Sequence, residues 1–284
     1  MSRLLAALAA ATLLAACSLP GTLQARAFTT GFKAGETIRY RVHTVVSGSL
    51  SLNSQQLPLS SDQTVTEQLT VKSVDRSGTA SVELGVVDLI QQATGAAGSA
   101  APQPAVLQIG SDGRIRAGAA VQLGGPIPSI PGSDQLTPLL PGRPVAPGDS
   151  WTQKYSRPNP YGSGGFQFSG HSRYLRDEAV SGAQTAAIET TLAGPIDFTI
   201  DYSKLPQPPA PSSPPSSLPA GPIHYTGTVT STTTYWIDLD SRQVVKSTGS
   251  GSYVLDYGTA LASGVSGPQQ VTFNGTIKTE VAKF

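Results

Sequence analysis

Residues 62–89 read DQTVTEQLTVKSVDRSGTASVELGVVDL, and this stretch decides the fold class. Apolar residues alternate with polar ones on both sides of the segment 75–78, Asp-Arg-Ser-Gly, whose residue types favour a tight turn. Alternation with a period of two is typical of a β-strand that buries one of its faces. We therefore predict an antiparallel hairpin with strands at 62–74 and 79–89.

The same alternation recurs outward from this hairpin along most of the chain. Strands are indicated at 36–46, 106–109, 114–121, 196–202, 223–239, 242–255 and 271–281. Helical periodicity with capping residues is almost absent. These features predict an all-β, antiparallel fold of about ten to twelve short strands separated by turns. A sheet of that size tends to curl or to split into two layers, and we favour a curled sheet or open barrel.

The second half of the chain echoes the first. Residues 148–151 (GDSW) resemble 35–38 (GETI), residues 182–189 resemble 78–83, and residues 236–244 resemble 107–115. We expect a single β domain over 32–284 that contains two tandem meanders, 32–123 and 146–284. The alternative to a duplication is that antiparallel meanders use the same turn-forming residues whatever their origin. Residues 205–222, nearly all Pro, Ser and Ala, predict a solvated loop because such a run cannot pair within a sheet.

The N-terminus carries an export signal. Arg3 precedes an apolar run at 4–14 that is too short to span a bilayer, and small residues follow it. The run ends in Leu14-Ala15-Ala16-Cys17, which resembles the lipobox of bacterial lipoproteins. That resemblance implies cleavage of a signal peptide, 1–16, between Ala16 and Cys17, and attachment of acyl chains such as palmitate to Cys17. Residues 17–31 would then be the lipidated N-terminus and tether. The alternative is an ordinary secretory signal with an incidental cysteine.

Composition narrows the possible partners. Charged residues make up only 13% of the chain, and the mature part carries as many basic as acidic residues once Arg3 is removed. A nucleic-acid partner needs a basic surface, so we expect none, and the balance also argues against a patch for anionic membranes. Cys17 is the only cysteine, so the mature chain has neither a disulfide nor a free thiol. We expect membrane association through lipidated Cys17.

The residue after the cysteine bears on localisation. In lipoproteins of bacteria with two membranes, Asp at this place usually retains the protein at the inner membrane, and this chain has Ser18. The resemblance therefore implies an outer membrane location facing the periplasm. In an organism with one membrane it implies the outer face of the cytoplasmic membrane.

Few residues suggest catalysis or metal binding. His43, His171 and His224 fall on separate predicted strands without metal-ligand spacing, and no nucleophile or phosphate-binding motif is present. We therefore predict no catalytic residue, no metal site and no cofactor. Glu83 and Glu189 occupy matched places in the two predicted meanders, and as a pair of carboxylates they would support a hydrolase alternative.

Aromatic residues concentrate in the second half of the chain. This asymmetry suggests either an apolar cleft or a core. As candidate ligand-facing aromatics we single out Trp151, Phe166, Phe168, Tyr235 and Trp236.

The mature part resembles β-rich bacterial envelope lipoproteins of unknown function, through residues 144–151 (PVAPGDSW) and 237–239 (IDL). At a coarser level it is similar to half-barrel envelope lipoproteins that carry lipids or acylated proteins, although it lacks the helices that plug those barrels. We expect a membrane-anchored, non-enzymatic protein that binds a hydrophobic ligand, an amphiphile, or an envelope protein. The alternatives are an envelope hydrolase with paired carboxylates and a structural spacer or scaffold.

Overall fold

The computed structural model describes residues 24–52, 55–94, 104–117, 137–159, 162–201, 222–259 and 269–284. The described residues form eleven strands: β1 (Thr37–Leu52), β2 (Gln55–Val74), β3 (Ala80–Thr94), β4 (Ala105–Ile109), β5 (Ile115–Ala117), β6 (Ser150–Pro158), β7 (Gly162–Val180), β8 (Ala183–Asp201), β9 (Pro222–Asp238), β10 (Val244–Thr259) and β11 (Gln269–Lys283). Within these ranges there is no helix, and so none of a length and hydropathy that would cross a bilayer.

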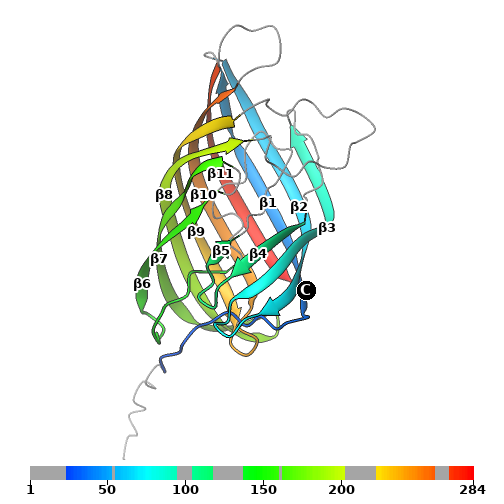
Figure 1. The fold of residues 1–284 in the computed structure, drawn as a ribbon, viewed down its shortest axis with the longest axis vertical. Coiled ribbons are helices and arrows are strands. Elements are labelled where there is room, and N and C mark those ends of the chain that lie inside the picture. Colours follow the sequence, from blue (N-terminus) through cyan, green and yellow to red (C-terminus); the bar gives the residue numbers. More distant parts are fainter. Residues whose placement is uncertain are drawn as a thin grey trace, which may run out of the picture.

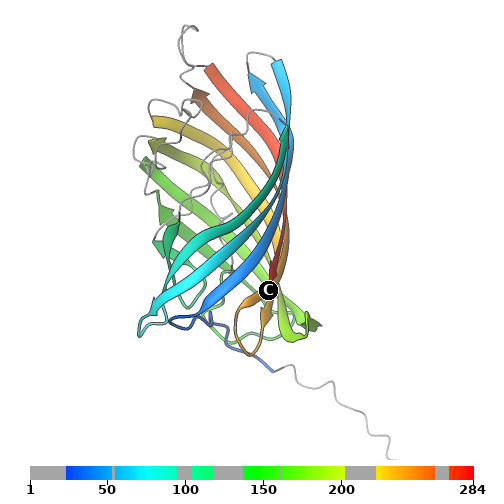
Figure 2. The same cartoon turned by 90° about the vertical axis from the view of Figure 1, so that its right-hand side faces the viewer.

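All eleven strands belong to one antiparallel sheet, in the order β5-β4-β3-β2-β1-β11-β10-β9-β8-β7-β6. Strands that are consecutive in sequence pair with each other except β5 and β6, which are the two edges of the sheet. In addition β1 pairs with β11, which joins the first and last described strands along 13 residue pairs. The sheet curls into an open barrel whose edge strands are β5 and β6 (Figures 1 and 2). The predicted all-β, antiparallel, curled architecture is confirmed.

The two faces of the sheet differ sharply in polarity. Along β9, Tyr225, Val229 and Tyr235 are buried, whereas the threonines between them are mostly exposed. The pairing registers carry this alternation to the neighbouring strands, so that the concave face is largely apolar and the convex face is built from Thr, Ser and charged side chains. The sheet thus presents its apolar side inward.

A seam separates the two edge strands. In the described residues no backbone ladder joins β5 to β6; side chains bridge them instead. The Tyr155 hydroxyl donates to the carbonyl oxygen of Ile115 (2.7 Å), and the Arg114 guanidinium donates to Oε1 of Gln153 (2.7 Å). The barrel is therefore held together at this point by polar side-chain contacts.

Segments outside the strands fill one end of the barrel, which we call the closed end. Phe28, Leu140 and Val145 pack there against buried strand residues. These three residues belong to a buried group at the closed end that we call the lower cluster. Its other members are Trp151, Tyr174, Ala186, Ile188, Tyr235, Ile237 and Val244. A second cluster around Ile38, Leu69 and Leu107 continues the packing beneath β1–β4.

The N-terminal segment enters the fold earlier than the sequence suggests. We expected a tether as far as residue 31, yet Phe28 is only 8% exposed and its ring meets Tyr174 edge-on, with centroids 5.2 Å apart. Arg26 forms a two-way backbone bridge with Val145 (2.8 and 2.9 Å). A single buried aromatic residue such as Phe28 can fix a segment to the fold without any periodic pattern, so the sequence did not predict this contact. Residues 1–16 and 17–23 lie outside the described residues.

The internal echoes fall on corresponding elements. Gly35, just before β1, donates its N–H to Val71 (2.8 Å), and Gly148, just before β6, donates to Tyr174 (2.7 Å). Both glycines have positive φ, 81° and 98°. The other two echoes likewise lie at the β2–β3 and β7–β8 turns and at the β4–β5 and β9–β10 turns. The tandem duplication itself stays a prediction, because meanders of separate origin would share such turns.

Two prolines lie within strands of the sheet, although both fall outside the predicted strands 62–74 and 196–202. Pro58 extends β2 beyond the expected start at residue 62, and it lies outside the stretch of β2 that pairs with β3. Pro195 lies in β8 where the ladder with β7 is interrupted. Proline is tolerated at strand positions where the neighbouring strand needs no hydrogen bond from the backbone nitrogen, because proline has no N–H. Of the predicted Pro-rich loop, 205–221 lies outside the described residues, and Pro222 begins β9.

Candidate functional site

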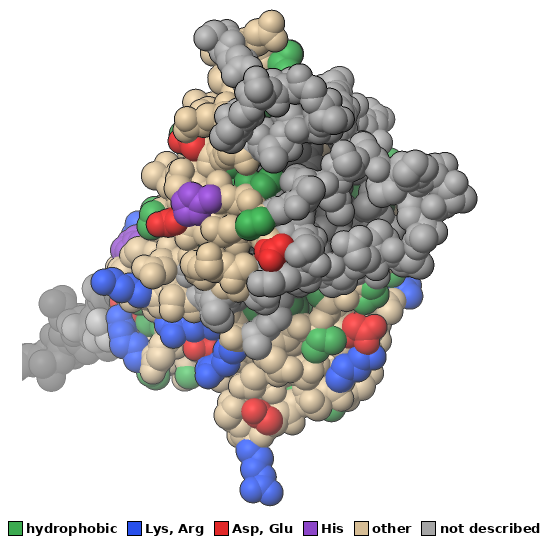
Figure 3. All heavy atoms as spheres, turned by 45° about the horizontal axis from the view of Figure 1, so that its top comes forward, with side chains coloured by type: hydrophobic (Ala, Val, Ile, Leu, Met, Phe, Trp, Pro, Cys, Tyr) green, Lys and Arg blue, Asp and Glu red, His purple; other side chains and the backbone are tan. Residues whose placement is uncertain are grey.

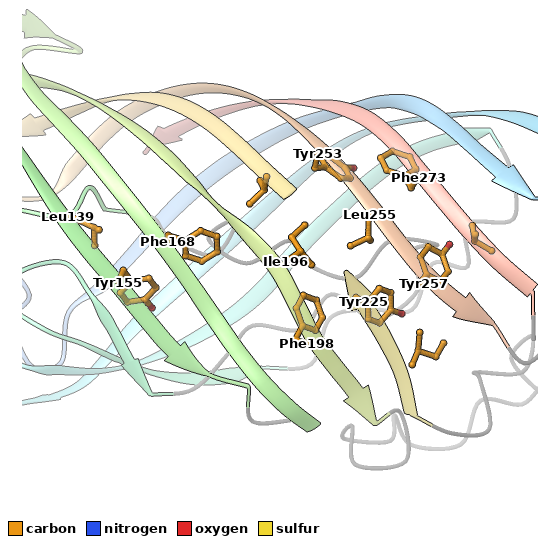
Figure 4. Close-up of a cluster of buried hydrophobic side chains, with 13 residues drawn as sticks. Leu139, Tyr155, Phe168, Ile196, Phe198, Tyr225, Tyr253, Leu255, Tyr257 and Phe273 are labelled. Carbon is orange, nitrogen blue, oxygen red and sulfur yellow. The ribbon is translucent and has the colours of Figure 1, made fainter. Parts of the chain in front are cut away.

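The largest set of apolar side chains on the concave face lies on β6–β11, away from the closed end, and we call it the aromatic cluster (Figure 4). Its members come from six strands and one loop residue. They are Leu139, Tyr155, Phe168, Ile196, Phe198, Ile223, Tyr225, Val229, Tyr253, Leu255, Tyr257, Val271 and Phe273. Because seven of these are aromatic rings on strands that the sheet places side by side, they form a continuous apolar wall.

The rings contact one another in three groups, one of which is the stacked pair of Tyr155 and Phe168. Tyr225 lies between Phe198 and Tyr257, with centroid separations of 5.3 and 5.2 Å. Tyr253 stacks on Phe273 at 4.8 Å with an interplanar angle of 25°. Offset ring contacts of this kind add about 0.5–1.5 kcal/mol each beyond the area they bury. The wall is therefore a packed surface with fixed ring positions.

Glycines seat the rings. A Cβ on Gly275 would lie 2.3 Å from the ring of Phe273, and one on Gly48 would lie 2.7 Å from the same ring. The ring of Phe273 thus occupies the space that side chains at these two positions would fill. Glycine at these points of β1 and β11 lets the aromatic side chain lie flat on the sheet.

The phenols of the concave face are neutral. Burial raises the pKa of Tyr253 well above its ordinary value, and burial likewise raises the pKa of Tyr235 to about 12. The Tyr155 hydroxyl donates its hydrogen bond to the carbonyl oxygen of Ile115 across the seam. These groups offer polarity and hydrogen bonding without charge, which suits an uncharged apolar ligand body better than an ion.

Apolar side chains beside the aromatic cluster remain partly exposed. Six of them pack against it without full burial: Val46, Leu50, Leu59, Leu192, Ile200 and Ile277. Near them on the same face, Ser231, Thr233 and Thr279 are also partly exposed. The concave face therefore offers accessible apolar surface next to short hydroxyl side chains.

The structure separates the five aromatics that the sequence singled out. Only Phe168 belongs to the aromatic cluster, where its ring stacks on Tyr155 with centroids 6.3 Å apart. Trp151 and Tyr235 face inward too, but in the lower cluster at the closed end. The indole N–H of Trp151 donates there to the carbonyl of Leu139 (2.9 Å). Phe166 lies in β7, and its side chain is outside the described residues.

Trp236 lies on the opposite face from the other described candidates. Its indole N–H donates to Oε1 of Glu178 (2.6 Å), and the Lys246 ammonium lies 5.3 Å from the ring centroid. The indole donor, followed by Arg176, holds the pKa of Glu178 below its ordinary value. Trp236 therefore belongs to a polar contact on the convex face and does not share a face with Tyr235, because adjacent strand residues point to opposite sides.

The carboxylates behind the hydrolase alternative are not brought together. Glu83 lies on β3, where it pairs with Lys72 (2.5 Å), and Glu189 lies opposite Arg173 on β8. Five strands separate β3 from β8 in the sheet, and both carboxylates face outward.

The histidines make convex-face contacts instead of a shared site. His43 lies 2.9 Å from Asp62, His224 lies 3.1 Å from the Thr199 hydroxyl, and His171 lies near Thr152. Among the described residues no group of three or more His, Cys, Asp or Glu could hold a metal ion.

Most members of the aromatic cluster were missed as site residues, although a signal for them exists. Tyr225 and Val229 fall on one face of β9, and Tyr253, Leu255 and Tyr257 on one face of β10. Choosing aromatics by even spacing within each strand would have selected them. The sequence of a single strand does not show which other strands lie beside it. Ala16 and Cys17, the expected cleavage and lipidation site, lie outside the described residues.

Comparison with known proteins yields little. No protein-family model matches the chain, and no curated protein matches it. Among solved structures the chain is similar to an outer membrane channel from Pseudomonas putida F1, at 13% identity and a TM-score of 0.32, over 93% of this chain and 99% of that chain. A TM-score of this size identifies no shared function.

Proposed function

We propose that the chain is an exported bacterial lipoprotein, anchored through Cys17, whose concave face binds an amphiphile in the cell envelope without catalysing a reaction. The sequence Leu14-Ala15-Ala16-Cys17 supports the anchor. A single acyl chain holds a protein only marginally at a membrane, whereas two or three chains on one cysteine hold it stably. In a bacterium with two membranes, the proposed location is the periplasmic face of the outer membrane.

The observation that carries the binding proposal is the polarity of the sheet. An apolar side chain left partly exposed on a concave surface forgoes about 25 cal/mol for each Å² of apolar area that a ligand would cover. Val46, Leu59 and Ile277 are such side chains, and they border the aromatic cluster. Covering this face with an apolar chain recovers that free energy, which makes the concave face the preferred site for a hydrophobic ligand.

An amphiphile fits this face better than a hydrocarbon does. Ser231, Thr233 and Thr279 lie partly exposed on the concave face beside the apolar side chains. A ligand with an apolar chain and a polar group satisfies both surfaces, since hydroxyls left buried against hydrocarbon lose their hydrogen bonds to water. The acyl chain would lie along the aromatic cluster, with the polar group toward these hydroxyls.

Two neighbouring valines of β1 provide a matched test. Val46 faces the aromatic cluster and Val45 faces outward beside Asp62 and Lys278. We would titrate the purified, acylated protein with a dansyl-labelled undecanoic acid and follow the dansyl fluorescence. Val46→Asn should weaken binding about tenfold, because the apolar contact of a valine is worth roughly 1.5 kcal/mol. Val45→Asn should leave the affinity unchanged.

Each other outcome has a definite meaning. Equal losses in both variants would place the probe away from the concave face and contradict the proposal. An absence of saturable binding in the unaltered protein would favour the spacer or scaffold alternative. Mass spectrometry of the same preparation tests the anchor separately, since an unmodified Cys17 contradicts the lipoprotein assignment whether or not the probe binds.

A further inference from the structure

The chain segment nearest the proposed anchor is fixed to the closed end of the barrel. Arg26 pairs with Val145 through backbone hydrogen bonds in both directions. Its guanidinium also lies 2.8 Å from the carboxylate of Asp177, at the closed end of β7. Phe28 inserts into the lower cluster beside Tyr174. The path of the chain at residues 26–28 is therefore set by backbone, charge and ring contacts together.

The following residues continue across the same end. The N–H of Thr30 donates to Ser111 (2.9 Å), and the N–H of Gly31 donates to Arg242 (3.2 Å). The amide of Gln243 donates in turn to the carbonyl of Gly31 (3.2 Å). Because Ser111 belongs to the β4–β5 turn and Arg242 to the β9–β10 turn, the segment is tied to turns from both halves of the barrel.

The length of the remaining chain limits where a lipid can sit. Six residues lie between Cys17 and Gln24, and the seven Cα–Cα steps that join the two reach at most about 25 Å when fully extended. By contrast β1, with 16 residues, rises about 40 Å along the barrel axis at roughly 3.3 Å per residue and a tilt of about 40°. Acyl chains on Cys17 are therefore confined to the neighbourhood of the closed end.

We propose that the closed end of the barrel lies against the phospholipid surface and that the opposite end points away from it. This orientation rests on the lipid anchor of the proposed function. It adds that the tether outside the fold is short, because residues 26–31 are part of the fold. A ligand would then be exchanged with a donor or acceptor on the side away from the anchoring membrane.

The distribution of charge suits this orientation. Lys33, Arg76 and Arg242 are exposed at the closed end and come from three different segments. The acid beside Arg76, Asp75, accepts hydrogen bonds from the backbone N–H groups of Ser77 and Thr79. Lys and Arg side chains gather toward the lower part of the molecule in Figure 3. Basic side chains within a Debye length of anionic lipid headgroups are attracted to them.

Among the described residues, acidic side chains lie near the end of the barrel opposite the closed end, which we call the far end. Asp197 and Asp201 lie near the far end of β8, and Asp256 lies near that of β10. An anionic membrane attracts the basic side chains of the closed end and repels these acidic ones. Both effects favour the orientation that the tether imposes. Overall charge balance hides this asymmetry, which explains why composition alone argued against a patch for anionic membranes.

Two single-cysteine variants test the orientation. An acylated Cys17 leaves no other thiol, so an added cysteine can be labelled alone with bimane maleimide. Ala34→Cys places the label at the closed end and Gln56→Cys places it at the far end of β2, and both positions are exposed. Each full-length, acylated protein is bound to vesicles of phosphatidylcholine and phosphatidylglycerol that contain a lipid with a nitroxide on its headgroup.

The expected result is quenching several-fold stronger at position 34 than at position 56. Equal or reversed quenching overturns the orientation. Omitting phosphatidylglycerol should reduce the quenching at position 34, and unchanged quenching overturns the electrostatic part. Mass spectrometry separates the two proposals: an unacylated chain contradicts the anchor, whereas an acylated, vesicle-bound chain with reversed quenching contradicts the orientation alone.

Discussion

The Tyr155 hydroxyl donates a hydrogen bond of 2.7 Å to the carbonyl oxygen of Ile115 and thereby links the two edge strands of the sheet. Tyr155 is 8% exposed and its ring also stacks on Phe168 in the aromatic cluster. One residue therefore serves both the closure of the barrel and the candidate binding face. Opening the seam and disturbing the ligand face are coupled through this side chain.

Tyr155→Phe should lower the free energy of unfolding by about 1 kcal/mol, because it removes a buried hydrogen bond and keeps the ring. Urea denaturation followed by circular dichroism measures the change. Tyr253→Phe is the matched control, since the hydroxyl of Tyr253 makes no hydrogen bond within the described residues although its ring is buried. Equal destabilisation of the two variants would show that the Ile115 contact does not hold the seam.

The close approach of the Phe273 ring to Gly275 supports a second prediction. Gly275→Ala puts a methyl group 2.3 Å from that ring, so the ring must move and disturb its stacking on Tyr253. We expect a loss of about 1–3 kcal/mol in stability, as in other overpacked sites, together with weaker binding of the dansyl probe. Gly258→Ala in β10 meets no atom within 4 Å and should be neutral or slightly stabilising. A stable Gly275→Ala protein with unchanged probe affinity would contradict this account of the wall.

Local sequence pattern was enough for the strands and for the polarity of the sheet. The alternation around Val65 and Leu69 predicted both the hairpin and which side chains would be buried, because a strand has only two faces. The same rule would have kept Tyr235 and Trp236 apart, had it been applied to the choice of site residues. Within one strand, therefore, the site was more predictable than the selection of aromatics suggested.

Contacts between distant segments could not be derived in this way. The pairing of β1 with β11 brings Leu50 opposite Phe273, and nothing in either segment specifies the other as its partner. The insertion of Phe28 beside Tyr174 is equally nonlocal. Such contacts are chosen by the packing of the whole barrel, so the position of the aromatic cluster required the structure.

Gln243 is a hub at the closed end and supports a third prediction. Its side-chain amide donates to Gly31 and Glu36, and its oxygen accepts from the ammonium of Lys283 (2.6 Å). Gln243→Ala leaves the buried Gly31 carbonyl and the partly buried Glu36 and Lys283 without this partner, which should cost about 1–3 kcal/mol and release the N-terminal segment. Trypsin cleavage after Arg26 should therefore become faster, as measured by mass spectrometry. In the control Gln270→Ala, which alters an exposed side chain, the cleavage rate should not change.

Trp236 and Glu178 support a prediction about pH. The indole donor at 2.6 Å and the neighbouring Arg176 lower the pKa of Glu178. A carboxyl whose pKa is lower in the folded state stabilises the fold above its unfolded pKa, and this contribution is lost as the pH falls through the folded pKa. Trp236→Phe removes the larger cause, so the pKa of Glu178 should rise toward its ordinary value and the acid-dependent loss of stability should shrink.

Carbon-13 NMR of the glutamate carboxyl groups measures this pKa directly during an acid titration. Trp151→Phe is the control, because the Trp151 indole donates to the carbonyl of Leu139 inside the barrel and should leave Glu178 unaffected. An unchanged Glu178 titration in Trp236→Phe would mean that Arg176 alone sets the pKa. In that case the convex-face indole would be held by its contact with Lys246 rather than by Glu178.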